Sequence, residues 1–250
     1  MQQPNSSLTM QLKKRFNWLL KNVYLDGFLH LLFPSNCLCC DGELLANENS
    51  ICSVCMHELP FTTFELYQEP SELDELFWGR VPVYASFSLL FYEKTNVVKP
   101  ILQALKYKGR SDVGIQFGQM IGEKLIQLKA FKDVQVLIPV PIHIKKRYVR
   151  GYNQTEVLAN GLAKVWNVKV DTSLISKSAH TKSQTTFGRF MRWDNVKDQF
   201  YISDKLKEYS SIAILDDVIT TGATSESIMR SILEINPQIR ISVISLAVTK

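Results

Sequence analysis

Two adjacent acids, followed by a turn rich in threonine, are the first residues whose types and spacing could do chemistry. Asp216 and Asp217 end an apolar run that begins at residue 211, and the turn opens a segment with helical spacing. Backbone N–H groups at the start of a helix lack partners and carry partial positive charge, so they favour a phosphate. A glycine lets an anion approach, and hydroxyls beside it can donate to that anion. The residues concerned are Val218, Thr220, Thr221, Gly222, Ala223 and Thr224.

A plainer interpretation of this segment is an ordinary strand, loop and helix with Thr221 as the N-cap. That interpretation explains the threonines and the glycine, but it does not explain two acids in a row. Carboxylates so close together repel one another unless hydroxyl donors or a cation compensate. A ligand with a phosphate at one end and vicinal hydroxyls in the middle satisfies both parts, and ribose 5-phosphate has that shape. We therefore predict a sugar-phosphate site.

All five cysteines fall between residues 37 and 55, and they predict a small metal module. Cys37 and Cys40 form one Cys-x-x-Cys unit, and Cys52 and Cys55 form a second. Two such turns complete the four-sulfur tetrahedron that Zn²⁺ prefers, with no open position for catalysis. We predict a structural Zn²⁺ in a ribbon-like module, with a hairpin in the intervening loop, rather than disulfides or plain thiols. Cys39 stays open as a replacement for Cys40.

Positive charge is concentrated in three windows, residues 99–110, 142–150 and 177–197, which carry +12 in a chain of net charge +5. These windows indicate one anion-binding surface if folding brings them together, and three solvated faces if it does not. Aromatic residues interleave with the cations, which suits single-stranded DNA but equally suits the packing of a loop. The aromatic residues are Tyr107, Tyr148, Tyr152, Phe187, Phe190 and Trp193.

Apolar runs alternate with segments of helical spacing after residue 83. The runs are 83–92, 134–140, 211–215 and 239–248, and helices are predicted over 95–107, 112–128, 153–166 and 223–235. Short strands that are apolar throughout indicate a parallel sheet covered on both faces, a doubly wound α/β fold. Ligands of such folds bind beyond the carboxyl ends of the strands. The polar segment 178–200 has little periodicity and is expected to be a functional or disordered loop.

The chain has 250 residues, of which 46% are hydrophobic and 21% charged, as expected for one to two folded domains. We divide it into an amphipathic helical segment (1–36), the zinc module (37–58), an acidic connector (59–82) and the α/β domain (83–250). Lys21, Asp26 and His30 interrupt the apolar stretch 16–33. That stretch therefore predicts neither a signal peptide nor a membrane span, and we expect a cytoplasmic protein.

Residues 212–224 resemble the motif with which type I phosphoribosyltransferases bind 5-phosphoribosyl diphosphate (PRPP). All thirteen positions fit its pattern of four apolar residues, two acids, two apolar residues and Thr-Thr-Gly-x-Thr. The resemblance extends to the ComF competence-protein family over most of residues 33–246. Besides the cysteine pairs, it rests on Leu105-Lys106-Tyr107-Lys108-Gly109, Pro139-Val140-Pro141-Ile142-His143, Arg150-Gly151-Tyr152-Asn153-Gln154 and Gln184-Thr185-Thr186-Phe187, with Arg192 and Asn195 beyond.

The resemblance implies roles for the matching residues. Asp216 and Asp217 would be the catalytic pair that holds the ribose 2- and 3-hydroxyls, and residues 218–224 would hold the 5-phosphate. A basic surface for the pyrophosphate and its Mg²⁺ would comprise Lys106, Lys146 and Arg150. A flexible hood over the site would include Gln184, Arg192 and Asn195. The family tends to have an arginine where Lys177 stands, and lysine lacks the bidentate fork of arginine.

The resemblance implies two functions. The first is a Mg²⁺-dependent phosphoribosyltransferase that acts in DNA uptake and natural transformation, with its acceptor left open. The second is a non-catalytic competence factor that binds single-stranded DNA and keeps PRPP binding as a regulatory or vestigial property. Expected partners are PRPP, single-stranded DNA and a competence helicase or other DNA-processing proteins. The residues leave the oligomeric state open.

Overall fold

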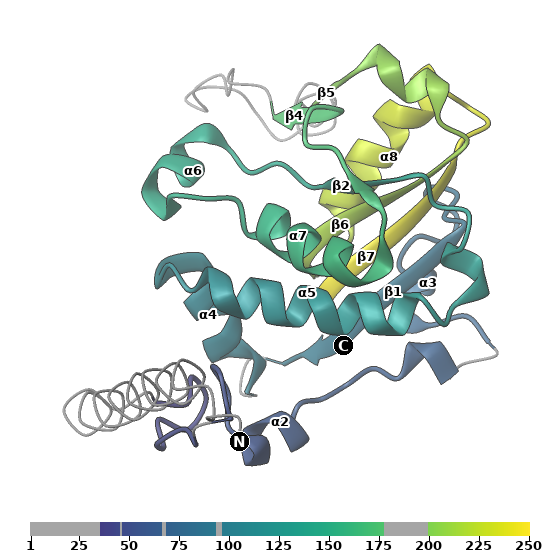
Figure 1. The fold of residues 1–250 in the computed structure, drawn as a ribbon. Helices are drawn as coiled ribbons and strands as arrows, with labels where there is room; N and C mark the ends of the chain where they lie inside the picture. The colour runs from purple at the N-terminus through teal and green to yellow at the C-terminus, as the bar shows by residue number, and fades with distance from the viewer. Residues whose placement is uncertain (1–35, 46, 67–68, 94–96, 178–199) are drawn as a thin grey trace, which may run out of the picture. The chain divides into compact units, whose positions relative to one another are not determined.

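The computed structural model describes residues 36–45, 47–66, 69–93, 97–177 and 200–250 (Figure 1). The chain divides into two compact units, Met1–His57 and Glu58–Lys250. The predicted N-terminal amphipathic helix and the predicted hood residues Gln184, Arg192 and Asn195 lie outside the described residues. None of the described helices is long and apolar enough to cross a membrane.

The described part of the first unit is a turn followed by a short helix, α2 (Ser53–His57). The N–H of Cys37 donates to the carbonyl oxygen of Gly42 at 2.8 Å, and Asn36 and Glu43 form an antiparallel bridge. Asp41 takes a positive φ of 59°, which closes the tight turn. The predicted hairpin through Asp41 and Gly42 is thus present.

The second unit is built on five parallel strands in the order β1-β7-β6-β2-β3. Their bounds are β1 (Ala85–Tyr92), β7 (Arg240–Thr249), β6 (Ser211–Ile219), β2 (Val136–Pro139) and β3 (Lys169–Val170). A separate antiparallel pair consists of β4 (Ile175–Lys177) and β5 (Phe200–Ile202). The apolar residues of the central strands are buried, so the predicted parallel α/β fold is confirmed.

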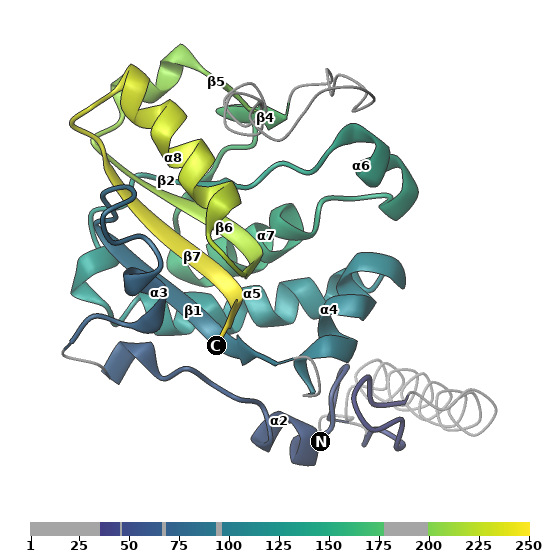
Figure 2. The same cartoon turned by 180° about the vertical axis from the view of Figure 1, so that it is seen from behind.

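Helices cover both faces of the sheet. Helices α5 (Ser111–Leu125) and α7 (Gln154–Trp166) lie on one face, and α8 (Ala223–Ile235) lies on the other (Figures 1 and 2). α5 and α7 approach closely, because a Cβ added at Gly118 would collide with the carbonyl oxygen of Leu158. The remaining elements are short, apart from α4 (Val98–Tyr107): η1 (Phe64–Leu66), α3 (Glu72–Glu75), η2 (Lys129–Phe131), α6 (Ile144–Arg150) and η5 (Asp204–Glu208).

The stretch predicted as a connector packs against β1 through residues 60–62, η1 and α3. The N–H of Phe91 donates to the carbonyl oxygen of Pro60 at 2.8 Å, and Phe61 forms an antiparallel bridge with Leu90. Leu73 and Phe77 are fully buried. This stretch therefore contributes to the core of the second unit.

Strand β6 is longer than the apolar run 211–215 from which it was predicted. The run predicted a strand that ends in the two acids, but β6 continues through them because β7 pairs with it along its length. Asp216 lies opposite Ser245, and Val218 lies opposite Ala247. On its other side, β2 ends at Pro139, which pairs with Leu215. From Asp216 onward, β6 is therefore paired on one edge only.

Candidate functional site

The acid pair lies at the switch point of the sheet. From β2 the chain crosses through α7 to β3, and from β6 it crosses through α8 to β7 in the opposite direction. Ligands of doubly wound sheets bind where such crossovers diverge, at the carboxyl ends of the strands. Asp216 and Asp217 stand there, just beyond the end of β2. The sequence could predict the carboxyl edge but not the strand order that creates the switch point.

The positive charge of Lys106 compensates part of the negative charge of the acid pair. The Nζ atom of Lys106 on α4 lies 2.8 Å from Oδ2 of Asp217, and both side chains are largely buried. Burial, followed by the negative charge of Asp217, raises the pKa of Asp216 to about 7, whereas the charge of Lys106 acts to lower it. The backbone N–H of Asp217 also donates to Asp216 at 2.8 Å. The acid pair thus combines adjacent charges with a perturbed pKa, a combination that is common in active sites.

One cation from each predicted basic window acts at this place. Lys106 comes from the first window and contacts Asp217. Lys177, at the end of β4, has its pKa lowered by burial and by the positive charge of Lys146, while Asp216 acts in the opposite sense. Lys177 pairs with Phe200 across β4 and β5, so the two ends of the segment predicted as a functional or disordered loop lie side by side. The described parts of the three windows therefore favour one anion-binding surface.

The turn after β6 leaves the start of α8 without a side-chain cap. The N-cap is Gly222, at a φ of 71°, and no side chain bonds to the cap position. Thr221 is therefore not the N-cap of the plainer interpretation; its hydroxyl only receives a long contact from the N–H of Ala223 at 3.5 Å. Thr220, Thr221, Ala223 and Thr224 are exposed, whereas Gly222 is buried. The start of the helix is open to an anion.

Two residues of the predicted connector, Phe77 and Arg80, contact this turn and α8. Arg80 donates to the carbonyl oxygens of Leu76 at 2.7 Å and Thr221 at 2.8 Å, and it pairs with Glu226 of α8. A Cβ at Gly222 would lie 2.9 Å from Cε1 of Phe77. Sequence analysis missed both Arg80 and Phe77, because nothing in a single arginine and a single phenylalanine indicates which distant turn they contact.

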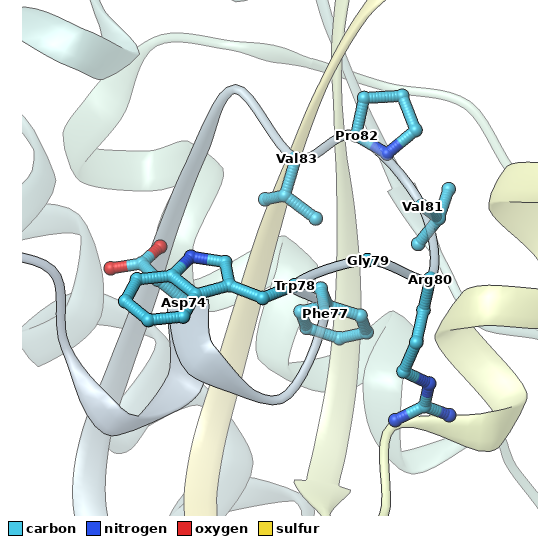
Figure 3. A pocket seen from close by; sticks show the side chains of 8 residues that line it. All are labelled: Asp74, Phe77, Trp78, Gly79, Arg80, Val81, Pro82 and Val83. Carbon is cyan, nitrogen blue, oxygen red and sulfur yellow. The ribbon is translucent and has the colours of Figure 1, made fainter.

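Phe77 and Arg80 also line a cavity of about 470 Å³, together with Asp74 and the other residues of 77–83 (Figure 3). Its acid, Asp74, accepts from the N–H of Ser71 at 2.8 Å and from the hydroxyl of Ser86 at 2.6 Å. The exposed Trp78 forms one wall. The polar groups of this cavity serve the local structure, so we assign the chemistry to the acid pair instead.

Helix α6 follows β2 and carries the second basic window. Arg150 donates to Oε1 of Gln154 at 2.7 Å, and its guanidinium carbon lies 5.3 Å from the centre of the Tyr107 ring. His143 is the N-cap, since its side chain accepts from the N–H of Lys145 at 3.2 Å. No residue of α6 is buried. Lys146 is exposed.

Four thiols form the predicted metal cluster. The sulfur atoms of Cys37, Cys40, Cys52 and Cys55 all lie within 4.8 Å of one another. Cys40 and Cys52 are 3.8 Å apart, close to the edge of a tetrahedron with Zn–S bonds of about 2.3 Å. The group contains Cys40 and not Cys39, which decides between the two alternatives for this cluster.

Backbone donors favour the thiolate of Cys37, whereas burial raises the pKa of Cys55. The N–H groups of Cys39 and Cys52 point at Sγ of Cys37 at 3.4 and 3.3 Å. Burial works to raise the pKa of Cys37, but these backbone donors, together with that of Cys40, outweigh it and lower the pKa to about 6. Burial raises the pKa of Cys39 to about 12. The close spacing of the four sulfur atoms suits Zn²⁺, which would hold the turn and α2 together.

Comparison with known proteins gives relatives over most of the chain, although no protein-family model matches it. Competence protein F of Haemophilus influenzae is 23% identical over 220 residues, covering 79% of this chain and 90% of the relative. DNA utilization protein YhgH is 22% identical over 223 residues in Escherichia coli K12 and 24% over 213 in Salmonella typhimurium, each covering 81% of this chain and 92% of the relative.

Solved structures give distant similarities to this chain. Glutamine PRPP amidotransferase of Bacillus subtilis is 17% identical with a TM-score of 0.39, over 56% of this chain and 30% of that one. A hypoxanthine phosphoribosyltransferase of Staphylococcus aureus is 10% identical with a TM-score of 0.33, over 56% and 68%. Over most of its length the chain is therefore similar to competence protein F and to YhgH, which confirms the resemblance stated from the motifs, and the parallel sheet and the cysteine cluster agree with it.

Proposed function

We propose that this protein binds PRPP with Mg²⁺ at the switch point of its sheet and acts in the uptake and use of DNA. The first part is supported by the acid pair, the open turn and the lysines around them. The second part is supported by the names of its relatives, a competence protein and DNA utilization proteins. The observation that carries the proposal is the placement of Asp216 and Asp217 on an unpaired strand edge that leads directly into an uncapped helix start.

The chain's own residues divide the work. The carboxylates of Asp216 and Asp217 accept hydrogen bonds from the ribose hydroxyls, and backbone N–H groups of residues 220–224 donate to the 5-phosphate. Lys146 and Arg150 supply positive charge for the diphosphate. Mg²⁺, when bound with the diphosphate, neutralises part of its charge. Because Asp217 already has Lys106 as a partner, the ion would be held through the diphosphate and not by this carboxylate.

In a transfer reaction, the bond between C1 of the ribose and the diphosphate oxygen breaks, and the diphosphate leaves with the electron pair. A nucleophilic acceptor then forms a bond to C1 and releases its proton. The transition state resembles a cation, so the protein needs to position the two partners, stabilise the leaving anion and exclude water. The acceptor is not part of the proposal.

Thermal unfolding tests PRPP binding. PRPP with Mg²⁺ at 100 times its Kd should stabilise the protein by about 2.7 kcal/mol, which corresponds to roughly 5–10 °C for a domain of this size. Asp216→Asn with Asp217→Asn should abolish the shift. The matched control is Asp133→Asn with Asp204→Asn, two exposed acids that precede β2 and β6 at the opposite edge of the sheet. No shift in the unaltered protein at millimolar PRPP would refute the proposal.

A second function, the binding of single-stranded DNA, is favoured by α6. Tyr148 of α6 is 90% exposed, Tyr107 at the end of α4 is 70% exposed, and Lys145 and Lys146 of α6 are also exposed. Exposed cations follow a phosphate backbone, and exposed aromatic rings stack on bases. We expect the log of the affinity to fall with the log of the salt concentration with a slope of about −3. Tyr148→Ala should weaken binding, and an affinity independent of salt would exclude this function.

A further inference from the structure

Lys106 forms a largely buried ion pair with Asp217, and the residues on either side of Lys106 are held by further contacts. Its Nζ lies 2.8 Å from Asp217, and only 24% of the Lys106 side chain and 16% of the Asp217 side chain are exposed. The residues on either side of Lys106 are fixed: the hydroxyl of Tyr152 donates to the carbonyl oxygen of Leu105 at 2.5 Å, and Arg150 covers the ring of Tyr107. The ammonium group is therefore presented to the acid pair by an anchored backbone.

Two adjacent carboxylates without a cationic partner would bind a divalent cation in preference to a sugar phosphate. Such a pair favours a divalent cation and repels an anion, whereas a sugar phosphate brings several negative charges. Lys106 cancels one of the two charges at Asp217, and its charge also acts on Asp216. A carboxylate has about four acceptor positions, so a lysine that takes one leaves room for ribose hydroxyls.

We propose that Lys106 is a selectivity residue that keeps divalent cations off the acid pair and admits an anionic sugar phosphate beside it. This inference rests on the proposed function for its sugar-phosphate half, and on the ion pair alone for its cation half. Removal of the lysine charge should strengthen the binding of divalent cations and weaken the binding of the sugar phosphate. If Lys106 had only a structural role, its replacement would weaken the binding of both ligands.

The experiment compares Lys106→Gln with Lys108→Gln in the zinc-loaded, full-length protein. Lys108 is exposed, lies two residues away and loses the same charge. Mn²⁺ alone, measured by electron paramagnetic resonance, probes the cation, and titration with PRPP in the presence of Mg²⁺ probes the sugar phosphate. We expect Lys106→Gln to bind Mn²⁺ at least about tenfold more tightly and PRPP at least about tenfold more weakly, because the substitution removes a unit charge from a largely buried site. Asp217→Asn in the Lys106→Gln background should remove the added Mn²⁺ affinity.

Lys106→Arg, which keeps the charge, should behave like the unaltered protein toward both ligands. Equal behaviour of the two glutamine variants, or a parallel loss of both affinities in Lys106→Gln, would overturn the inference. An unchanged PRPP affinity in Lys106→Gln would overturn it as well. If the unaltered protein binds no PRPP, the proposed function fails, and the Mn²⁺ comparison then decides on Lys106 by itself.

Discussion

Replacing Gly222 by alanine tests whether the turn that leads into α8 is as tightly specified as its contacts indicate. Gly222 has a φ of 71°, and an added Cβ would lie 2.9 Å from Cε1 and 3.2 Å from Cζ of Phe77. The ring cannot retreat easily, because Phe77 is only 1% exposed. The substitution therefore imposes both a backbone strain and a steric conflict at the position where the phosphate is proposed to bind.

The two contributions can be separated by a matched glycine. Gly151 has a φ of 79°, and nothing lies within 4 Å of an added Cβ. The left-handed conformation costs an ordinary residue roughly 1–2 kcal/mol, and forcing a methyl group into packed surroundings costs about 1–3 kcal/mol more. We expect Gly151→Ala to lower the Tm by about 2–8 °C and Gly222→Ala to lower it further, by about 4–20 °C, at 2–4 °C per kcal/mol for a domain of this size.

Differential scanning calorimetry of the two variants gives the comparison, with Phe77→Leu added to Gly222→Ala to shorten the opposing side chain. The double variant should recover part of the loss relative to the sum of the single changes, because neighbouring residues that conflict are not additive. If Gly222→Ala and Gly151→Ala lowered the Tm equally, the contact with Phe77 would contribute nothing and the reasoning would be refuted.

Three further predictions follow from the cysteine cluster, the acid pair and the arginine behind the turn. Protein purified under reducing conditions without chelators should hold about one Zn²⁺ by elemental analysis, and Cys40→Ser should lose it while Cys39→Ser keeps it; the reverse pattern would contradict the cluster. Because the pKa of Asp216 is raised to about 7 from an ordinary value near 3.9, the folded state binds the extra proton between these values and loses stability as the pH rises through them. Asp216→Asn should thus raise the Tm at pH 8 and not at pH 4, and an equal effect at both would exclude the shift. Arg80 donates from one nitrogen to two carbonyl oxygens and pairs with Glu226 through the other. Arg80→Lys keeps the charge but not this arrangement, so urea unfolding should show a loss of about 1–3 kcal/mol. Arg240→Lys, in an exposed pair, should lose less than about 1 kcal/mol, and equal losses would count against a role of Arg80 in holding the turn.

Features of the structure that depend on residues close together in the sequence could be predicted. The apolar runs and helical spacings predicted the parallel α/β fold, and the spacing of the cysteines predicted the cluster. These patterns are local, because burial on both faces of a strand and two sulfurs on one turn depend on neighbouring residues. The extension of β6 to Ile219 was not predictable in this way, since it depends on how far β7 runs alongside it.

Long-range contacts account for what the sequence did not indicate. The ion pair between Lys106 and Asp217 joins residues more than a hundred positions apart, as does the bond from Arg80 to Thr221. These partners are not related by any periodic spacing, so one sequence alone contains no pattern that predicts their contact. The connector was assigned by its acidic composition, whereas its role behind the turn depends on the positions of Phe77 and Arg80 in the folded unit.

The most direct test of the proposed site is a crystal structure of the protein grown with PRPP and Mg²⁺. We predict the ribose hydroxyls within hydrogen-bonding distance of the carboxylates of Asp216 and Asp217, and the 5-phosphate against the backbone N–H groups of residues 220–224. Density for the ligand at another place, with Lys106 still on Asp217 and the turn after β6 unchanged and vacant, would contradict the account.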